Sequence, residues 1–158
     1  FISIFASLLV IGILASLFFK RALWGILAIV PLTSAVIINF GFMGFFGIEL
    51  SHVTAILSSI IIGVGVDFAI HYISQFRRLS RSMSSEKVSK EVVEDVGYPI
   101  VLDAASNMGF GALVFSAFVP IQYIGGLMVF AMLSTSLGTL TILSAITELF
   151  KKKLIVKG

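Results

Sequence analysis

Five apolar runs, each about twenty residues long, constrain what this chain can fold into. A transmembrane helix needs about 20 consecutive apolar residues, because the hydrocarbon core of a bilayer is about 30 Å thick. The sequence therefore predicts an all-α integral membrane protein with five transmembrane helices, at about residues 1–19, 22–40, 53–73, 99–119 and 121–149.

The composition agrees with a membrane protein and argues against several other classes. Of the 158 residues, 58% are hydrophobic and only 12% are charged, whereas about a quarter are charged in a soluble domain. There is no cysteine, so disulfides and thiolate metal sites are excluded. The two histidines have no metal-binding spacing, and no nucleophile–base pair is visible. We therefore expect no metal, no cofactor and no enzymatic activity.

The basic residues predict the orientation in the membrane. Lysine and arginine occur only after the first, third and fifth runs, which five spans place on one side. By the positive-inside rule that side is the cytoplasm. The N-terminus is then outside and the C-terminus is cytoplasmic, and we expect the cytoplasmic membrane of a prokaryote. Since topology accounts for the basic charge, no nucleic-acid partner is expected. The chain also starts within an apolar run, so we expect it to be part of a longer protein.

The polar segment between the third and fourth runs is expected to form a short amphipathic helix. Ser84 or Ser85 can cap such a helix, and Gly97 is a natural end for it. Three valines spaced by four form one narrow apolar stripe: Val88, Val92 and Val96. The pattern predicts a cytoplasmic helix at about 84–97 that lies on the membrane surface.

The third run contains a single carboxylate, Asp67, with three apolar turns before it and about two after it. A charged aspartate at the centre of a membrane helix costs roughly 2.5–3.5 kcal/mol. Such a residue indicates an ion or proton site that faces a protein interior. The alternative is a carboxylate that only joins helices. His71 follows one turn later, where it could also face the headgroups.

Polar and small residues form stripes on three of the predicted helices. Those on the third and fifth runs are Ser59, Gly63, Ser134, Thr135 and Gly138, and they favour close helix packing. The candidates for a proton relay are Asp67, His71, Asp103 and Asn107. Together the stripes predict a packed interior with a hydrated polar pocket. The alternatives are plain packing faces, and an Asp103 that simply reaches water at the membrane surface.

Two stretches resemble the resistance–nodulation–division (RND) superfamily, specifically its MMPL or predicted-exporter branch. They are Gly63-Val64-Gly65-Val66-Asp67-Phe68-Ala69-Ile70-His71, and the run 107–116, which is similar to that branch's GFGxLxFS pattern. The resemblance covers essentially the whole chain, as five of the six helices in one RND half. The same unit is called a sterol-sensing domain in eukaryotic relatives. Many relatives have Tyr after the Asp, where this chain has Phe68.

The resemblance implies a function. It implies that Asp67 relays protons, with contributions from Asn107 and Asp103, in a secondary transporter that exports lipids or other amphiphilic molecules. The implied partners are membrane lipids, the exported molecule, protons and the other half of the transporter with its extracytoplasmic domain; a homo-oligomer is also considered. The alternative is a sterol-sensing-like regulatory domain that binds lipid between its helices.

Overall fold

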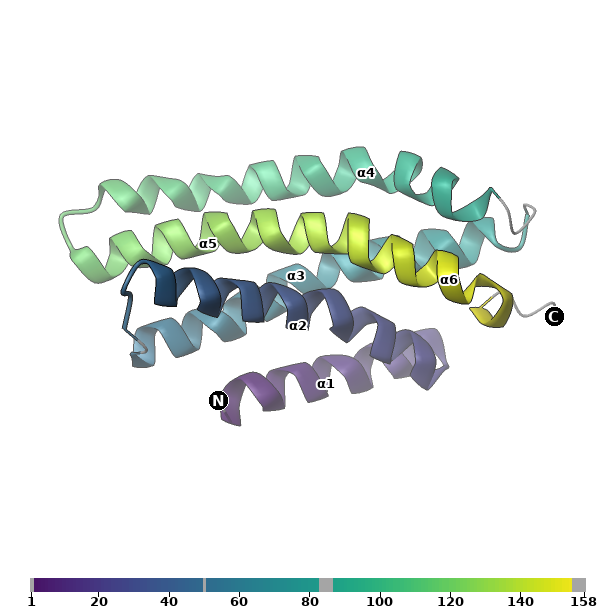
Figure 1. The fold of residues 1–158 in the computed structure, drawn as a ribbon, viewed down its shortest axis with the longest axis horizontal. Helices are drawn as coiled ribbons and strands as arrows, with labels where there is room; N and C mark the ends of the chain where they lie inside the picture. Colours follow the sequence, from purple (N-terminus) through teal and green to yellow (C-terminus); the bar gives the residue numbers. More distant parts are fainter. Residues whose placement is uncertain (1, 50, 83–86, 155–158) are drawn as a thin grey trace.

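The computed structural model describes residues 2–49, 51–82 and 87–154, and all the secondary-structure elements in this part of the chain are helices joined by short turns. Figure 1 shows the helices in chain order. A 3₁₀ segment, η1 (Met108–Phe115), directly continues the helix Val88–Asn107, and a π-helical turn, η2 (Thr139–Leu143), joins the helix Val119–Gly138 to the helix Ser144–Leu154. The prediction of an all-α protein is confirmed. The α-helices are α1 (Ile2–Phe19), α2 (Ala22–Phe45), α3 (His52–Leu79), α4 (Val88–Asn107), α5 (Val119–Gly138) and α6 (Ser144–Leu154).

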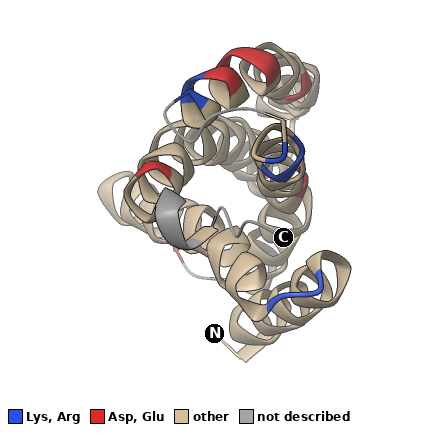
Figure 2. Cartoon of the chain, turned by 90° about the vertical axis from the view of Figure 1, so that its right-hand side faces the viewer, with Lys and Arg blue, Asp and Glu red and all other residues tan. Residues whose placement is uncertain are grey.

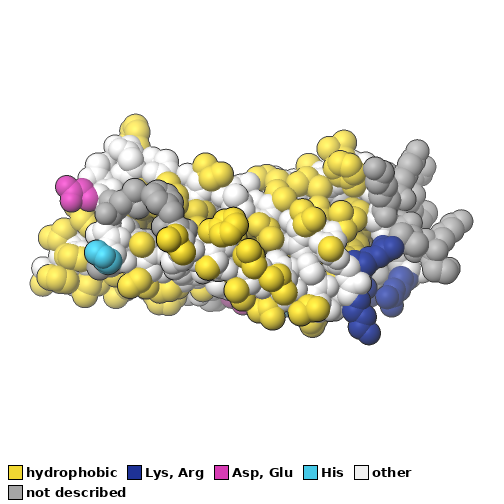
Figure 3. Space-filling view, turned by 90° about the horizontal axis from the view of Figure 1, so that it is seen from below, with side chains coloured by type: hydrophobic (Ala, Val, Ile, Leu, Met, Phe, Trp, Pro, Cys, Tyr) yellow, Lys and Arg dark blue, Asp and Glu magenta, His cyan; other side chains and the backbone are white. Residues whose placement is uncertain are grey.

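Several helices are suited to cross a membrane. Within the described residues, four helical segments are long and apolar enough: Ala22–Phe45, Thr54–Leu79, Val88–Phe115 and Val119–Phe150. The apolar helix α1 is shorter; its 18 residues rise about 27 Å, close to the hydrocarbon thickness of a bilayer. Figure 3 shows hydrophobic side chains over the middle of one face, with charged side chains at its two ends. The chain is a multi-pass membrane protein, and a fifth span in α1 stays a prediction.

Most of the other helices pack on α3. It packs against α1, α2, α4 and α5, whereas α1 lies at the periphery against α2 and α3 (Figure 1). The largest fully buried side chains include three aromatic residues of α3, Phe68, Tyr72 and Phe76. The core therefore forms around one side of α3.

The basic residues gather at one end of the bundle, as the sequence predicts. The α1–α2 turn, the end of α3, the start of α4 and the end of α6 all lie there (Figure 1), and Figure 2 looks onto this end. Arg77 also packs inside it, with its guanidinium carbon 5.3 Å from the ring centroid of Phe19 and 6.0 Å from that of Trp24. This end is called the basic end below. That it faces the cytoplasm remains a prediction.

The prediction of a separate surface helix at about 84–97 is wrong, because the described part of this segment belongs to the longer helix α4. Helix α4 runs without a break through Gly97 and Pro99, and it begins after Lys87 without a side-chain cap. The proposed caps, Ser84 and Ser85, lie outside the described residues. The helix continues because its buried stripe continues, in the order Val88, Val92, Val96, Ile100 and Ala104. A helix that ended at Gly97 would separate the valines from the remainder of this stripe.

Other helices are longer than their apolar runs. The second run extends to Phe45, where Phe42 stacks on Phe130 of α5 with ring centroids 4.0 Å apart. Helix α3 begins at a capping box in which the Thr54 amide donates to Ser51 Oγ (3.3 Å) and the Ser51 amide donates to Thr54 Oγ1 (2.8 Å). A capping box satisfies backbone amides that the first helical turn leaves free. Contacts at the helix ends therefore extend these elements beyond the hydrophobic pattern.

Candidate functional site

Asp67 lies on the outside of this bundle. One side of α3 is exposed along four turns, and we call it the outer face of α3: Ile56, Ile60, Gly63, Asp67 and His71. The opposite side carries the buried aromatic residues of the core. The expectation that Asp67 faces the interior is therefore wrong for this bundle. The carboxylate and the imidazole share one face, as their spacing predicts.

The close approach between helices occurs at Gly65, not at the predicted Gly63. A Cβ atom on Gly65 would lie 2.7 Å from Thr135 Cγ2 and 2.9 Å from Leu32 Cδ2. A Cβ atom on Gly63 would meet no atom within 4 Å in the described structure. The two glycines lie on different sides of α3, because two residues correspond to about 200° of helix rotation. Gly65 therefore faces α2 and α5, while Gly63 is open.

The polar stripe of α5 lies partly in the core and satisfies itself. Thr135 and Gly138 are buried, and Ser134 is half-buried. The hydroxyls of Ser134 and Thr135 donate to the carbonyl of Ala131, at 3.0 and 2.7 Å. The hydroxyl hydrogens of Ser134 and Thr135 are therefore already used in hydrogen bonds within α5. Thr135 packs against Gly65, on a different side of α3 from Asp67, so the stripe of α5 does not form a polar pocket with that carboxylate.

Ser59 links α3 to the peripheral helix. Its hydroxyl oxygen lies 3.0 Å from that of Ser3 on α1, within hydrogen-bond distance. Ser59 is half-buried, at the edge of the outer face of α3. The predicted stripe from Ser59 to His71 is therefore not one uniform surface. Ser59 contacts α1, whereas Gly63, Asp67 and His71 are exposed.

Asp67 and Asp103 lie at the same depth. Gln75 Nε2 of α3 donates to Asp95 Oδ2 of α4 at 2.6 Å, and the two helices run in opposite directions (Figure 1). Asp67 precedes Gln75 by eight residues and Asp103 follows Asp95 by eight. Each carboxylate is therefore about 12 Å from the Gln75–Asp95 hydrogen bond, measured along its own helix axis. The antiparallel packing brings two carboxylates to one level within the predicted spans.

Asp103 has a polar neighbour on its own helix. The amide nitrogen of Asn107 donates to Asp103 Oδ1 (3.2 Å) and to the Asp103 carbonyl (3.0 Å). Asp103 is exposed and Asn107 is half-buried. The structure thus brings the two relay candidates of α4 into contact. Together with Asp67 and His71 they place two carboxylates, an imidazole and an amide within the helices that can span the membrane.

A buried polar pair was missed by the sequence reasoning. Tyr72 Oη and Thr147 Oγ1 lie 3.0 Å apart between α3 and α6, and both residues are fully buried. They are 75 residues apart in the chain, so no local pattern connects them.

In the described part of the chain, no group of three or more His, Cys, Asp or Glu side chains could hold a metal ion.

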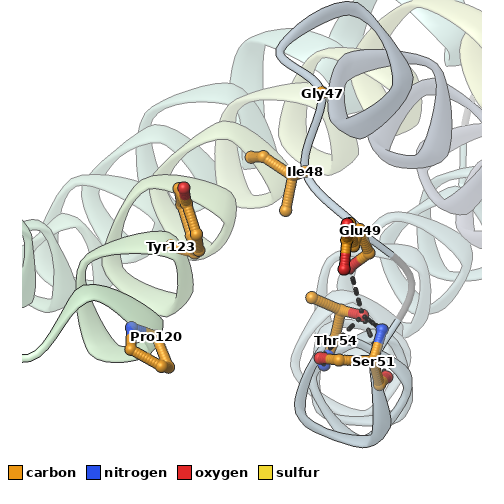
Figure 4. A pocket seen from close by; sticks show the side chains of 7 residues that line it. All are labelled: Gly47, Ile48, Glu49, Ser51, Thr54, Pro120 and Tyr123. Atoms are coloured by element: carbon orange, nitrogen blue, oxygen red, sulfur yellow. Dashed lines mark hydrogen bonds between the residues drawn. The ribbon is translucent and has the colours of Figure 1, made fainter.

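A cavity opens at the end of the bundle opposite the basic end. It has a volume of about 380 Å³ and lies between the α2–α3 connection and the start of α5 (Figure 4). Glu49, Ser51 and Thr54 lie on one side of it, and Pro120 and Tyr123 lie on the other. The Thr54 hydroxyl donates to the Glu49 carbonyl at 3.4 Å. Its lining is both polar and apolar.

These observations define a polytopic membrane domain with carboxylates inside its spans. The chain belongs to the sterol-sensing domain family: the family described as "Sterol-sensing domain of SREBP cleavage-activation" matches residues 17–148. A membrane protein of Methanocaldococcus jannaschii, MJ1562, is 34% identical over 108 residues, which are 66% of this chain and 28% of that protein. The chain therefore matches less than a third of that relative's length. No solved structure matches the chain significantly.

Proposed function

We propose that this chain is the membrane domain of a proton-driven secondary transporter that exports lipids or other amphiphilic molecules. The observation that carries the proposal is the position of Asp67, in the middle of α3 on its outer face. A carboxylate that faced lipid there would cost several kcal/mol. A second helical bundle packed on the outer face of α3 would remove that contact with lipid.

The outer face of α3 has the features of a helix-packing surface. Gly63, one turn from Asp67, has open space around it, so another helix can approach its backbone closely. The exposed side chains of Ile56 and Ile60 continue the same face. In the proposed transporter the covering bundle is the other half, as in the RND superfamily and its MMPL branch. A second copy of this chain could occupy the same place.

Proton transfer at this surface supplies the coupling. Asp67 takes up a proton from one side of the membrane and releases it to the other, and the imidazole of His71 lies on the same face, one turn nearer the basic end. Asp103 stands at the same depth on α4, and Asn107 lies one turn further from the basic end. Each change of charge on Asp67 alters which packing of the two bundles is favoured. A proton that crosses about 150 mV supplies roughly 3.5 kcal/mol.

The surroundings of the domain follow from the same proposal. The basic end faces the cytoplasm of a prokaryotic cell, and the cavity of Figure 4 faces the other side, near the extracytoplasmic domain that would handle the exported molecule. We propose transport and not catalysis, with no cofactor, because the residues offer a proton path but no nucleophile–base pair.

A second function is supported by the family match. The chain belongs to the sterol-sensing domain family, so the bundle could bind a lipid and regulate another domain without any proton flux. The two functions differ in one measurable property. In a transporter, Asp67 gains and loses a proton in every cycle, and in a lipid receptor it does not.

The test is Asp67→Asn in the full-length protein, reconstituted into proteoliposomes with a pH-sensitive dye inside. The substitution keeps size and hydrogen bonding but removes the titratable charge. Gradient-driven export of a fluorescent phospholipid should fall to background, while the variant still accumulates in the membrane. The matched control is Asp103→Asn, the same change at the same depth, which should retain part of the export. Wild-type export by Asp67→Asn would contradict proton coupling and favour the lipid receptor.

A further inference from the structure

A groove at the basic end combines arginine and phenylalanine side chains. It lies between the end of α1 and the last turns of α3 and has a volume of about 370 Å³. We call it the arginine groove, after its lining residues Phe18, Phe19, Ser74, Arg77, Arg78 and Arg81. Half of these described lining residues carry a guanidinium group, and none of them carries a carboxylate.

The three arginines have different roles in this groove. Arg77 is half-buried and packs over the rings of Phe19 and Trp24, a cation–π arrangement that holds it in place. Arg78 and Arg81 are exposed. In the part of the chain that the structure describes, none of the three forms an ion pair with a carboxylate; the ion pair found there joins Lys90 to Glu94, on α4. The groove therefore carries positive charge that no described acidic side chain neutralises.

The chemistry of the lining selects a phosphate group. Guanidinium groups bind phosphate oxygens through paired, charge-assisted hydrogen bonds, and the Ser74 hydroxyl is a further donor. Phe18 is 68% exposed and stands beside the arginines at the end of the apolar helix α1. An apolar wall next to a cationic cluster suits a molecule with a phosphate at one end and a hydrocarbon chain at the other.

We propose that the arginine groove binds the phosphate headgroup of an anionic membrane lipid, with an acyl chain against Phe18 and α1. Basic pockets between transmembrane helices are known places for acidic lipid headgroups. The position of the groove, where the apolar surface of the bundle meets the basic end, places the headgroup at the level of the membrane surface. The site does not depend on proton coupling at Asp67, so it holds for a transporter and for a lipid receptor.

Binding of fluorescent phosphatidylglycerol to the full-length protein in detergent micelles tests the proposal. The wild type should bind this lipid more tightly than phosphatidylcholine with the same label. Arg78→Gln combined with Arg81→Gln should weaken phosphatidylglycerol binding about 25-fold, roughly fivefold for each lost charge. Its affinity for phosphatidylcholine should stay unchanged. Arg77 is left intact in this variant because it packs against Phe19 and Trp24 in the fold.

The control removes the same charge elsewhere at the basic end. Lys87→Gln with Lys90→Gln changes two exposed residues at the start of α4, Lys87 directly before it and Lys90 in its first turn, that do not line the groove. Phosphatidylglycerol binding should persist. An equal loss in this control would show general attraction to the charged end and overturn the site. Equal wild-type affinity for the two lipids would overturn it as well. Complete displacement of the lipid by millimolar inorganic phosphate would overturn the lipid assignment in favour of a free anion site.

Discussion

Tyr72 of α3 and Thr147 of α6 are joined by a buried hydrogen bond, with 3.0 Å between their hydroxyl oxygens. The Thr147 hydroxyl also donates to the Ser144 carbonyl at 2.9 Å. Since a hydroxyl has one proton, the phenol of Tyr72 is the donor to Thr147. This bond connects α3 to the last helix of the bundle, at a place where both residues are shielded from solvent.

Tyr72→Phe should lower the free energy of unfolding. The substitution keeps the ring in the core and removes one hydrogen bond, whose net contribution is about 0.5–1.5 kcal/mol. The measurement is equilibrium unfolding of the full-length protein in mixed micelles. The matched control is Tyr98→Phe on α4, where the tyrosine is 74% exposed and no stability change is expected. Equal effects of the two variants would show that the buried bond contributes nothing.

Gly65→Ala should destabilise the bundle, and Gly63→Ala should not. The new methyl group at Gly65 would collide with Thr135, whose β-branched side chain has little freedom to move, and with Leu32. Overpacking of this kind costs about 1–3 kcal/mol. Within this bundle Gly63 is open, so alanine there removes backbone entropy from the unfolded chain without a clash with any described atom. Its methyl group can collide only with a second bundle packed on the outer face of α3. The measurement is the thermal unfolding temperature of the two variants, which should be lower for Gly65→Ala than for Gly63→Ala. A lower temperature for Gly63→Ala would place the close helix contact at Gly63.

Gly97→Ala tests the continuity of α4. Inside a helix, alanine is about 0.5–1 kcal/mol more favourable than glycine, and no described atom lies within 4 Å of the new methyl position. The variant should therefore be as stable as the wild type or more stable. The control is Gly47→Ala, at φ +65°, where a side chain is strained by about 1–2 kcal/mol. A loss of stability in Gly97→Ala similar to that of the control would mean that the helix ends at Gly97.

Reporter fusions test the predicted orientation. Fusions after Lys20 and Lys90, both at the basic end, should report the cytoplasm. Fusions near Glu49 and Gln122, at the other end, should report the outside (Figure 1). The positive-inside rule gives this expectation. A cytoplasmic signal at Glu49 would reverse the orientation, and the proposed direction of proton flow would reverse with it.

The sequence alone determined the class of the protein and the ends of the bundle. Apolar runs separated by basic and polar segments leave helices as the structure that satisfies the backbone in lipid. The spacing of lysine and arginine placed the basic residues at one end, because consecutive antiparallel helices alternate in direction. The carboxylate of Asp67 stood out for the same reason, since an ionised group within an apolar run is costly wherever the run folds.

Only the tertiary structure decided which side of each helix is buried. Around Asp67, helix α3 is apolar on nearly every side, so its pattern of polarity does not single out a core face. In a membrane, lipid is as apolar as the protein interior, and shape and close packing select the contact surface instead of hydrophobicity. The fit of Thr135 against Gly65 therefore placed α3 in the bundle and left Asp67 on its outer face. Helix α4 continues through Gly97 in the structure, and Val96 and Ile100, on either side of that glycine, belong to one buried cluster with residues of α3 and α5. The local sequence does not contain those distant residues.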